Sequence, residues 1–236
     1  MLQKALTLYR EIRRHKSLTP DSSESWKYYS RWKKTLVEGK SSLDFGLPWF
    51  TFQAIDYIDQ HLPEGARVFE FGGGGSTVFF QKKKCHVYTV EHHKEWFENI
   101  SKSFQSSTPA WNGFLIEAEQ GDVVAHPEIG NPLHYTSDDE GYKNQNFKAY
   151  ATKIDTFENE YFDLVLVDGR SRPSCVYHSI AKIKKGGFLV IDNSEREYYN
   201  AYFNTHFASQ FEKVLDVFGP VPYITWFHKT TIYRKK

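Results

Sequence analysis

The chain has 236 residues, of which 40% are hydrophobic and 25% charged, and its formal net charge is +1 at pH 7. This length and composition fit one α/β domain with additions and exclude a disordered chain. The near-neutral charge argues against a general binder of polyanions, so a nucleic-acid partner is not expected.

The cysteines and the apolar runs indicate the cellular compartment of the protein. Cys85 and Cys175 lie far apart without a partner motif, so neither a disulfide framework nor a cysteine zinc site is expected. No apolar run approaches the length of a membrane span, and the first residues lack a signal-peptide core. We therefore expect a cytoplasmic protein without a membrane partner, and we leave open whether it forms a homo-oligomer.

Residues 1–45 are predicted to be a basic, helical extension that precedes a main domain over residues 46–236. Apolar residues recur at helical spacing near the start, at Leu2, Leu6, Tyr9 and Ile12. Residues 1–40 contain ten Lys and Arg against four Asp and Glu. This pattern fits either helices packed on the core with a solvated basic face or a surface for a phosphate-bearing partner, and we favour the first.

A glycine-rich loop follows the first predicted core strand, residues 67–71, in which Glu70 is the one acid. Four consecutive glycines form this loop, namely Gly72, Gly73, Gly74 and Gly75. Without a Cβ they allow positive φ and the close approach of a ligand. A helix is predicted to begin near Ser76 and Thr77, so its free N–H groups and positive dipole end should face the ligand.

The second predicted strand, residues 86–90, ends in Glu91. This acid lies 19 positions after Gly72. In a βαβ unit, that spacing places a carboxylate on the two hydroxyl groups of a ribose. The glycine loop and Glu91 together predict a nucleoside-containing ligand.

A long polar connection occupies residues 123–146, after a third strand predicted over residues 113–118. Long irregular segments inside compact domains are typically binding loops or lids. Its position after a strand should place it over the carboxyl edge of the sheet, where open α/β folds bind ligands. His134 and Tyr135 are candidate substrate contacts, and solvent exposure is the alternative.

Polar side chains end the two strands predicted over residues 162–167 and 188–191. The first strand leads into Asp168-Gly-Arg170-Ser-Arg172, and the second leads into Asp192-Asn193. The two arginines could bind a carboxylate or phosphate of a substrate, or pair with Glu195 or with Asp168 itself. A hairpin of two strands, predicted near residues 211–218 and 223–233, closes the chain.

Residues 50–236 resemble the class I S-adenosylmethionine-dependent methyltransferases. Glu70, Gly72 and Gly74 match their acid-x-Gly-x-Gly-x-Gly motif, with Ser76 in place of the last glycine. The segment 162–193 repeats their strand, acid, helix, Gly-Gly, strand, Asp-Asn succession. The resemblance implies a Rossmann-like three-layer α/β/α sandwich with a mainly parallel seven-stranded sheet and an antiparallel carboxy-terminal strand.

The resemblance also implies S-adenosylmethionine as cofactor and O-methylation of a small molecule. The implied cofactor-binding residues are Glu70, Gly72, Gly73, Gly74, Gly75, Ser76, Thr77, Glu91, His92, Asp122 and Asp168. Asp168 and Arg170 are the candidate catalytic residues, with Asp168, His92 or His134 as the proton acceptor in a reaction without metal.

Three strand-end oxygens, from Asp168, Asp192 and Asn193, resemble the metal set of the catechol and caffeoyl-coenzyme A O-methyltransferases. Carboxylate and amide oxygens suit magnesium, which would lower the pKa of an acceptor hydroxyl. The same residues also occur at such strand ends without a metal, so both mechanisms remain hypotheses.

Two other classes of protein share parts of this pattern. A nicotinamide-dependent oxidoreductase would need glycine at position 77 for Gly-x-Gly-x-x-Gly, where this chain has Thr77. A non-catalytic binding protein could retain the fold. Binding of S-adenosylmethionine, of its demethylated product or of NAD separates the three hypotheses.

Overall fold

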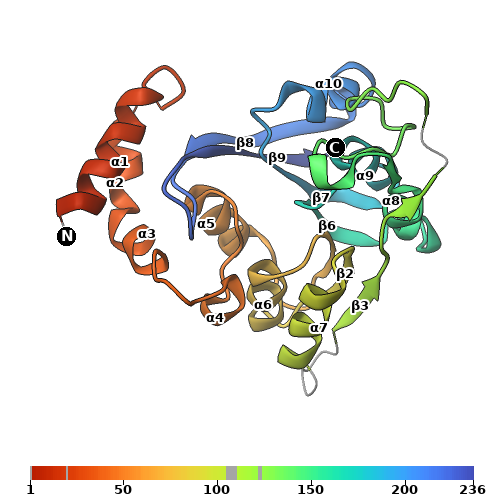
Figure 1. The fold of residues 1–236 in the computed structure, drawn as a ribbon, viewed down its shortest axis with the longest axis horizontal. Coiled ribbons are helices and arrows are strands. Elements are labelled where there is room, and N and C mark those ends of the chain that lie inside the picture. Colours follow the sequence, from red (N-terminus) through yellow and green to blue (C-terminus); the bar gives the residue numbers. More distant parts are fainter. Residues whose placement is uncertain (1, 20, 105–110, 122–123) are drawn as a thin grey trace.

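The computed structural model describes residues 2–19, 21–104, 111–121 and 124–236. A seven-stranded sheet has the order β3-β2-β1-β6-β7-β9-β8 (Figure 1). Its strands are β1 (Arg67–Phe71), β2 (His86–Glu91), β3 (Asn112–Leu115), β6 (Phe162–Val167), β7 (Ile183–Asp192), β8 (Phe211–Gly219) and β9 (His228–Lys235). Five strands run parallel, namely β1, β2, β3, β6 and β7. Strand β9 lies between β7 and β8 and is antiparallel to both. The predicted mainly parallel sheet with an antiparallel carboxy-terminal strand is confirmed.

Helices cover both faces of the sheet, which completes the predicted three-layer sandwich (Figure 1). The main-domain helices are α5 (Phe52–His61), α6 (Gly75–Lys82), α7 (Lys94–Ser103), α8 (Lys148–Thr152), α9 (Arg172–Ser179) and α10 (Glu197–His206). Alternate residues of β1 join opposite clusters, because successive side chains of a strand point to opposite faces. Val68 packs with α5 and α6, whereas Phe69 and Phe71 pack with α8 and α9.

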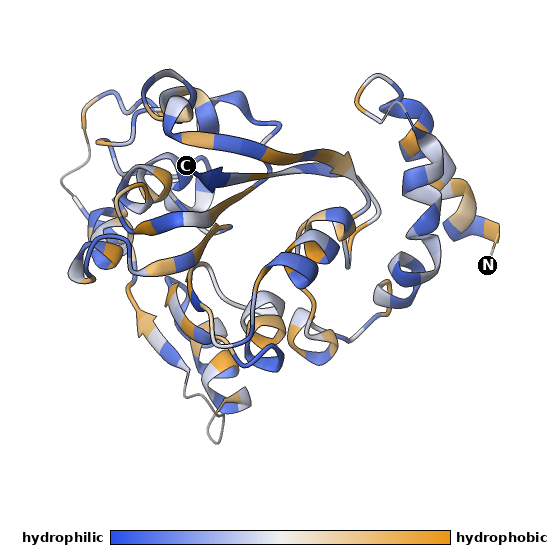
Figure 2. Cartoon of the chain, turned by 180° about the vertical axis from the view of Figure 1, so that it is seen from behind, coloured by the Kyte–Doolittle hydropathy of each residue, from blue (hydrophilic) through white to orange (hydrophobic). Residues whose placement is uncertain are grey.

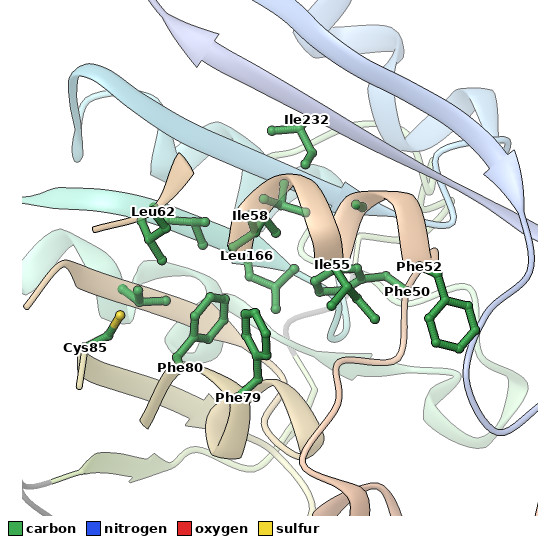
Figure 3. Close-up of a cluster of buried hydrophobic side chains, with 14 of the residues drawn as sticks. Phe50, Phe52, Ile55, Ile58, Leu62, Phe79, Phe80, Cys85, Leu166 and Ile232 are labelled. Atoms are coloured by element: carbon green, nitrogen blue, oxygen red, sulfur yellow. The ribbon is translucent and has the colours of Figure 1, made fainter. Parts of the chain in front are cut away.

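The core on the α5 and α6 face is drawn in Figure 3. Ile55, Ile58 and Phe80 meet Leu166 of β6 and Ile232 of β9 there. Figure 2 shows apolar residues concentrated along the central strands, whereas the helices alternate between apolar and polar residues. Truncating one such buried aliphatic side chain to alanine costs about 2–5 kcal/mol.

The amino-terminal arm consists of α1 (Leu2–Arg14), α2 (Ser22–Lys27), α3 (Tyr29–Thr35) and α4 (Ser42–Phe45). Helices α2 and α3 are separated at Tyr28. Leu8, Ile12 and Trp32 are buried in the same cluster as α5 and α6. The arm therefore packs on the main domain through its apolar residues.

Several strand boundaries differ from the prediction. Strand β3 ends at Leu115 rather than residue 118, and β9 begins at His228 rather than residue 223. Helix α9 begins at Arg172, because Pro173 is well suited to a first helical turn. Strand β7 begins at Ile183 rather than residue 188 and carries the left-handed Gly186 within it. The long connection contains a short antiparallel pair, β4 (Glu119–Gln120) and β5 (Gln145–Asn146).

Among the described residues, every helix is too short or too polar to cross a bilayer.

Candidate active site

A cavity of about 550 Å³ opens at the carboxyl edge of the sheet. Its walls come from the loops after β1, β2, β6 and β7, which bring together four of the segments predicted from the sequence. Residues at the start of β9 and in the loop before it complete the wall. The predicted residues that line the cavity are Gly72, Gly73, Gly74, Gly75, Ser76, Glu91, His92, Asp168, Arg170, Asp192 and Asn193.

The glycine loop is folded against the loop that follows β6. Gly72 has φ +87°, and a Cβ there would lie 3.0 Å from the Gly169 Cα. A side chain at this position would therefore strain the backbone and push the two loops apart. Glycine is required at position 72 for the approach of β1 and β6 as well as for the turn.

The four glycine N–H groups already have partners inside the protein. In order, they donate to Val90 O, Glu91 Oε2, Thr77 Oγ1 and Ser42 Oγ at 2.8, 3.1, 2.9 and 3.2 Å. A dinucleotide site uses such N–H groups to hold the pyrophosphate. This loop can shape a cavity, but its glycines do not offer a phosphate site.

Glu91 is a fixed carboxylate on the cavity wall, with only 3% of its surface exposed. Its Oε1 accepts the backbone N–H groups of His92 and His93, both at 2.8 Å, and its Oε2 accepts that of Gly73 at 3.1 Å. Burial acts to raise the pKa of Glu91, but these hydrogen bonds and the His92 ring lower it overall. Each carboxylate oxygen can accept more than one donor, so the group is an ionised acceptor suited to hydroxyl groups.

Glu70 and Thr77 lie beneath the glycine loop instead of lining the cavity. The hydroxyls of Thr77 and Thr89 both donate to Glu70 Oε1, the second at 2.8 Å. Glu70 Oε2 is buried without a hydrogen-bond partner in the described part of the chain. Burial raises the pKa of Glu70 to about 7. In this structure Glu70 ties the strands to the start of α6.

His92 and Arg170 are bound to each other and to acidic neighbours. His92 Nδ1 lies 2.9 Å from Glu91 Oε1, and Arg170 Nε donates to His92 Nε2 at 3.4 Å. Arg170 Nη1 lies 2.8 Å from Asp139 Oδ2. His92 Nε2 therefore has a hydrogen-bond partner, whereas Nδ1 is buried beside Glu91 without a hydrogen bond among the described residues. The position of Asp122, also predicted for this region, falls outside the described residues.

A guanidinium occupies the place where the sequence suggested a metal. Arg172 Nη2 lies 3.1 Å from Asp168 Oδ1, and Arg172 Nη1 lies 3.9 Å from Asp192 Oδ2. The side-chain amide of Asn193 lies against His228 Nδ1. In the described ranges, no three His, Cys, Asp or Glu side chains form a group that could hold a metal ion. The donor set does not fit a divalent cation, because a positive charge already lies between its two carboxylates.

The two carboxyl groups affect each other strongly. Burial and the nearby Asp192 carboxylate raise the pKa of Asp168 to about 8, against the opposing effect of Arg172. Two neighbouring carboxyl groups disfavour the ionisation of each other, because both would carry a negative charge. At neutral pH, Asp168 therefore retains a proton much more readily than an exposed aspartate.

His228 is a residue of the site that the sequence analysis missed. It lines the cavity at the start of β9, with 5% of its surface exposed. Its Nδ1 lies 3.3 Å from Asp192 Oδ2, and its Nε2 has no hydrogen-bond partner among the described residues. Asp192 is itself fixed by Thr230, whose hydroxyl donates to Asp192 Oδ1 at 2.9 Å. This arrangement orients the ring and leaves one nitrogen available for proton transfer.

The long connection is fastened at two points beside the cavity. Asp138 Oδ2 accepts from Arg196 Nη1 at 2.6 Å and from the hydroxyl of Tyr199 at 2.7 Å. Asp139 binds Arg170, as described above, and Tyr142 lines the cavity. His134 and Tyr135, the predicted substrate contacts, have partners elsewhere: Glu128 N–H donates to His134, and His178 contacts Tyr135.

The amino-terminal arm holds the loop between β8 and β9, which carries two other cavity residues, Ile224 and Trp226. Trp32 Nε1 donates to Ile224 O at 2.8 Å, and Phe227 N–H donates to Glu11 Oε2 at 3.1 Å. The arm therefore fixes one wall of the cavity in position.

Three solved structures are similar to this chain in fold. An O-methyltransferase from Bacillus cereus in complex with SAH is 13% identical over 88% of this chain and 96% of that chain, with a TM-score of 0.56. A methyltransferase-like protein from Silicibacter pomeroyi is 20% identical over 81% and 90%, with a TM-score of 0.52. TrmN from Thermus thermophilus is 12% identical over 87% and 52%, with a TM-score of 0.51.

No family model matches this chain, and no curated protein matches it in sequence. At these low identities the structural likeness establishes the fold alone. The chain has the Rossmann-like fold of the class I S-adenosylmethionine-dependent methyltransferases.

Proposed function

We propose that this chain is an S-adenosylmethionine-dependent methyltransferase that methylates a hydroxyl oxygen of a small, uncharged acceptor. The observation that carries the proposal is the His228–Asp192 pair. It lines the same cavity as the glycine loop and Glu91, which are suited to the donor. One cavity thus combines a nucleoside site with a base.

The donor side is supported by the glycine loop and Glu91. The loop offers close approach, and Glu91 Oε2, which within the described ranges accepts only the Gly73 N–H, is suited to accept from a ribose hydroxyl. Because the glycine N–H groups are already used, the site favours a nucleoside without a pyrophosphate over NAD. S-adenosylmethionine is such a nucleoside, and it supplies an electrophilic methyl group.

The acceptor side is supported by the chemistry of His228. A hydroxyl is a weak nucleophile until its proton is removed, and a positioned histidine can remove it. His228 Nδ1 lies beside both Asp192 Oδ2 and the Asn193 amide. In the tautomer whose Nδ1–H faces Asp192, Nε2 can take the proton of the acceptor hydroxyl, and Asp192 stabilises the resulting imidazolium. The acceptor oxygen then bonds to the methyl carbon, and the carbon–sulfur bond breaks to leave the demethylated product.

The lack of charge on the acceptor is inferred from the arginines. In the described lining of the cavity, Arg170, Arg172 and Arg196 each contact a carboxylate, at 2.8, 3.1 and 2.6 Å. The charge of each guanidinium is thereby partly offset by an acid of the protein, which weakens its attraction for a substrate phosphate or carboxylate. The cavity volume also lies in the range of about 300–1,000 Å³ that is usual for small-molecule sites.

The test is methyl transfer from donor labelled in its methyl group. The purified chain is incubated with a panel of uncharged alcohols and phenols, with carboxylate-bearing analogues of the same compounds, and with a mixture of RNA transcripts. Mass spectrometry then locates the label. The proposal expects methyl ethers of uncharged compounds and their loss in His228→Ala. Label on RNA or on nitrogen atoms would contradict the acceptor assignment.

A further inference from the structure

Arg172 holds together the carboxyl edge of β6 and β7. Its Nε donates to Gly169 O at 3.0 Å, its Nη2 donates to Asp168 O at 3.2 Å, and its Nη1 donates to Asp192 O. All three guanidinium nitrogens are thus fixed by backbone carbonyls from both strand ends. The ring of Tyr199 lies 5.2 Å from the guanidinium carbon on one side.

The same guanidinium contacts the two carboxylates that a metal would need. Its nitrogens lie 3.1 Å from Asp168 Oδ1 and 3.9 Å from Asp192 Oδ2. The side chain is only 10% exposed, so water screens these charges weakly. A divalent cation bound to both carboxylates would lie within a few ångströms of this fixed positive charge and would be repelled.

We propose that Arg172 is the resident cation of the active site and takes the place of a divalent metal. The two strand-end carboxylates are held by the guanidinium, and the acceptor hydroxyl is deprotonated by His228 without a metal ion. This inference rests on the proposed function for its catalytic part. Its structural part, exclusion of metal by Arg172, stands on the geometry alone.

The arrangement of contacts agrees with this assignment. Arg172 contacts Asp168, the first of the two acids, and the second, Asp192, contacts His228 Nδ1. Removal of the guanidinium would leave the two adjacent acids with the imidazole of His228 alone. Such a pair of carboxylates is the ligand type that Mg²⁺ and Mn²⁺ prefer.

The test measures binding of Mn²⁺ alone to the full chain, by electron paramagnetic resonance of the free ion. The wild-type chain should show no saturable binding at the site. Arg172→Gln should bind Mn²⁺ at least about tenfold more tightly than wild type, because the repulsive charge is gone. Arg172→Lys retains a charge and should bind no more tightly than wild type.

Arg170→Gln is the matched control, since Arg170 pairs with Asp139 and not with the strand-end carboxylates. It should not create Mn²⁺ binding. Stoichiometric Mn²⁺ binding by wild type, or equal binding by wild type and Arg172→Gln, would overturn the assignment. If Arg172→Gln does not fold, Mn²⁺ binding by the wild-type chain still tests the assignment. Turnover of the wild-type chain in excess chelator is the second measurement, and it should be unchanged.

The two proposals fail in different ways. Turnover by wild type that chelator abolishes and Mg²⁺ restores would contradict Arg172 as the resident cation and keep the methyltransferase. The absence of any binding of the demethylated donor would contradict the methyltransferase, and the Mn²⁺ comparison would still test Arg172.

Discussion

His228 Nδ1 lies 3.3 Å from Asp192 Oδ2, a contact made between the end of β7 and the start of the antiparallel β9. The pairing of Asp192 with Thr230 sets this contact. His228 lies two residues before Thr230 on the same face of β9, so it is the diagonal neighbour of Asp192. The parallel strands end at this edge of the sheet and β9 begins there. A base and its orienting carboxylate are thus placed by strand register.

Replacing His228 with alanine should lower the rate of methyl transfer by a factor of about 10²–10⁴, because the acceptor hydroxyl would lose its base. The affinity for the demethylated donor should stay within a few fold. Single-turnover rates with labelled donor measure the first quantity, and calorimetry measures the second. His206→Ala, on the exposed side of α10, is the matched control and should keep the wild-type rate. An unchanged rate in His228→Ala would remove this residue from the mechanism.

The pH dependence of the same rate should follow the ionisation of His228. Burial acts to lower the pKa of His228, but the charges of Asp192, Glu195 and Asp168 raise it overall above 6.5. A base acts when deprotonated, so turnover should rise as pH increases through this raised pKa. Asp192→Asn removes the largest opposing charge and should move the rising limb of kcat/KM to lower pH. A limb that stays in place would contradict His228 as the titrating base.

Replacing Trp32 with phenylalanine tests whether the arm positions the acceptor. The change removes the hydrogen bond to Ile224 O and leaves a buried carbonyl unpaired, which costs about 1–3 kcal/mol locally. We expect a higher KM for the acceptor with unchanged affinity for the demethylated donor. Trp26→Phe is the control, since Trp26 is 39% exposed and contacts only the arm residue Tyr29 among the ring contacts described. Equal loss of affinity for donor and acceptor would indicate general destabilisation instead.

Glu70 should make the free energy of unfolding depend on pH. Burial raises its pKa from 4.5 to about 7, so the folded state favours the protonated form. This stabilisation is complete below the unfolded pKa and is lost as pH rises through about 7, a change of about 3 kcal/mol. Glu70→Gln should remove that decline relative to wild type. Chemical denaturation at about pH 5 and about pH 8 measures it, with the exposed Glu95→Gln as control. Parallel curves for wild type and Glu70→Gln would show that Glu70 does not titrate in this range.

The fold and the donor side of the cavity were predictable because their signals are local in sequence. Gly72 to Gly75 and Glu91 belong to one βαβ unit, where spacing fixes their relative positions. His228 was not predicted, because its approach to Asp192 depends on the register between β7 and β9. A usable signal existed: the first residue of an antiparallel final strand lies at the carboxyl edge of the parallel strands. The partner of Arg172 also stayed open between Asp168 and Glu195, because the approach of Asp168 and Asp192 depends on the packing of α9 against the ends of β6 and β7.

The central claim is tested most directly by calorimetric titration of the full chain with the demethylated product of S-adenosylmethionine and, separately, with NAD. We expect saturable binding of the first ligand and none of the second. Glu91→Gln should weaken the binding by about 1.5–3 kcal/mol, because its hydrogen bonds to the ribose lose their charge. Saturable binding of NAD without binding of the demethylated product, or full affinity in Glu91→Gln, would contradict the account.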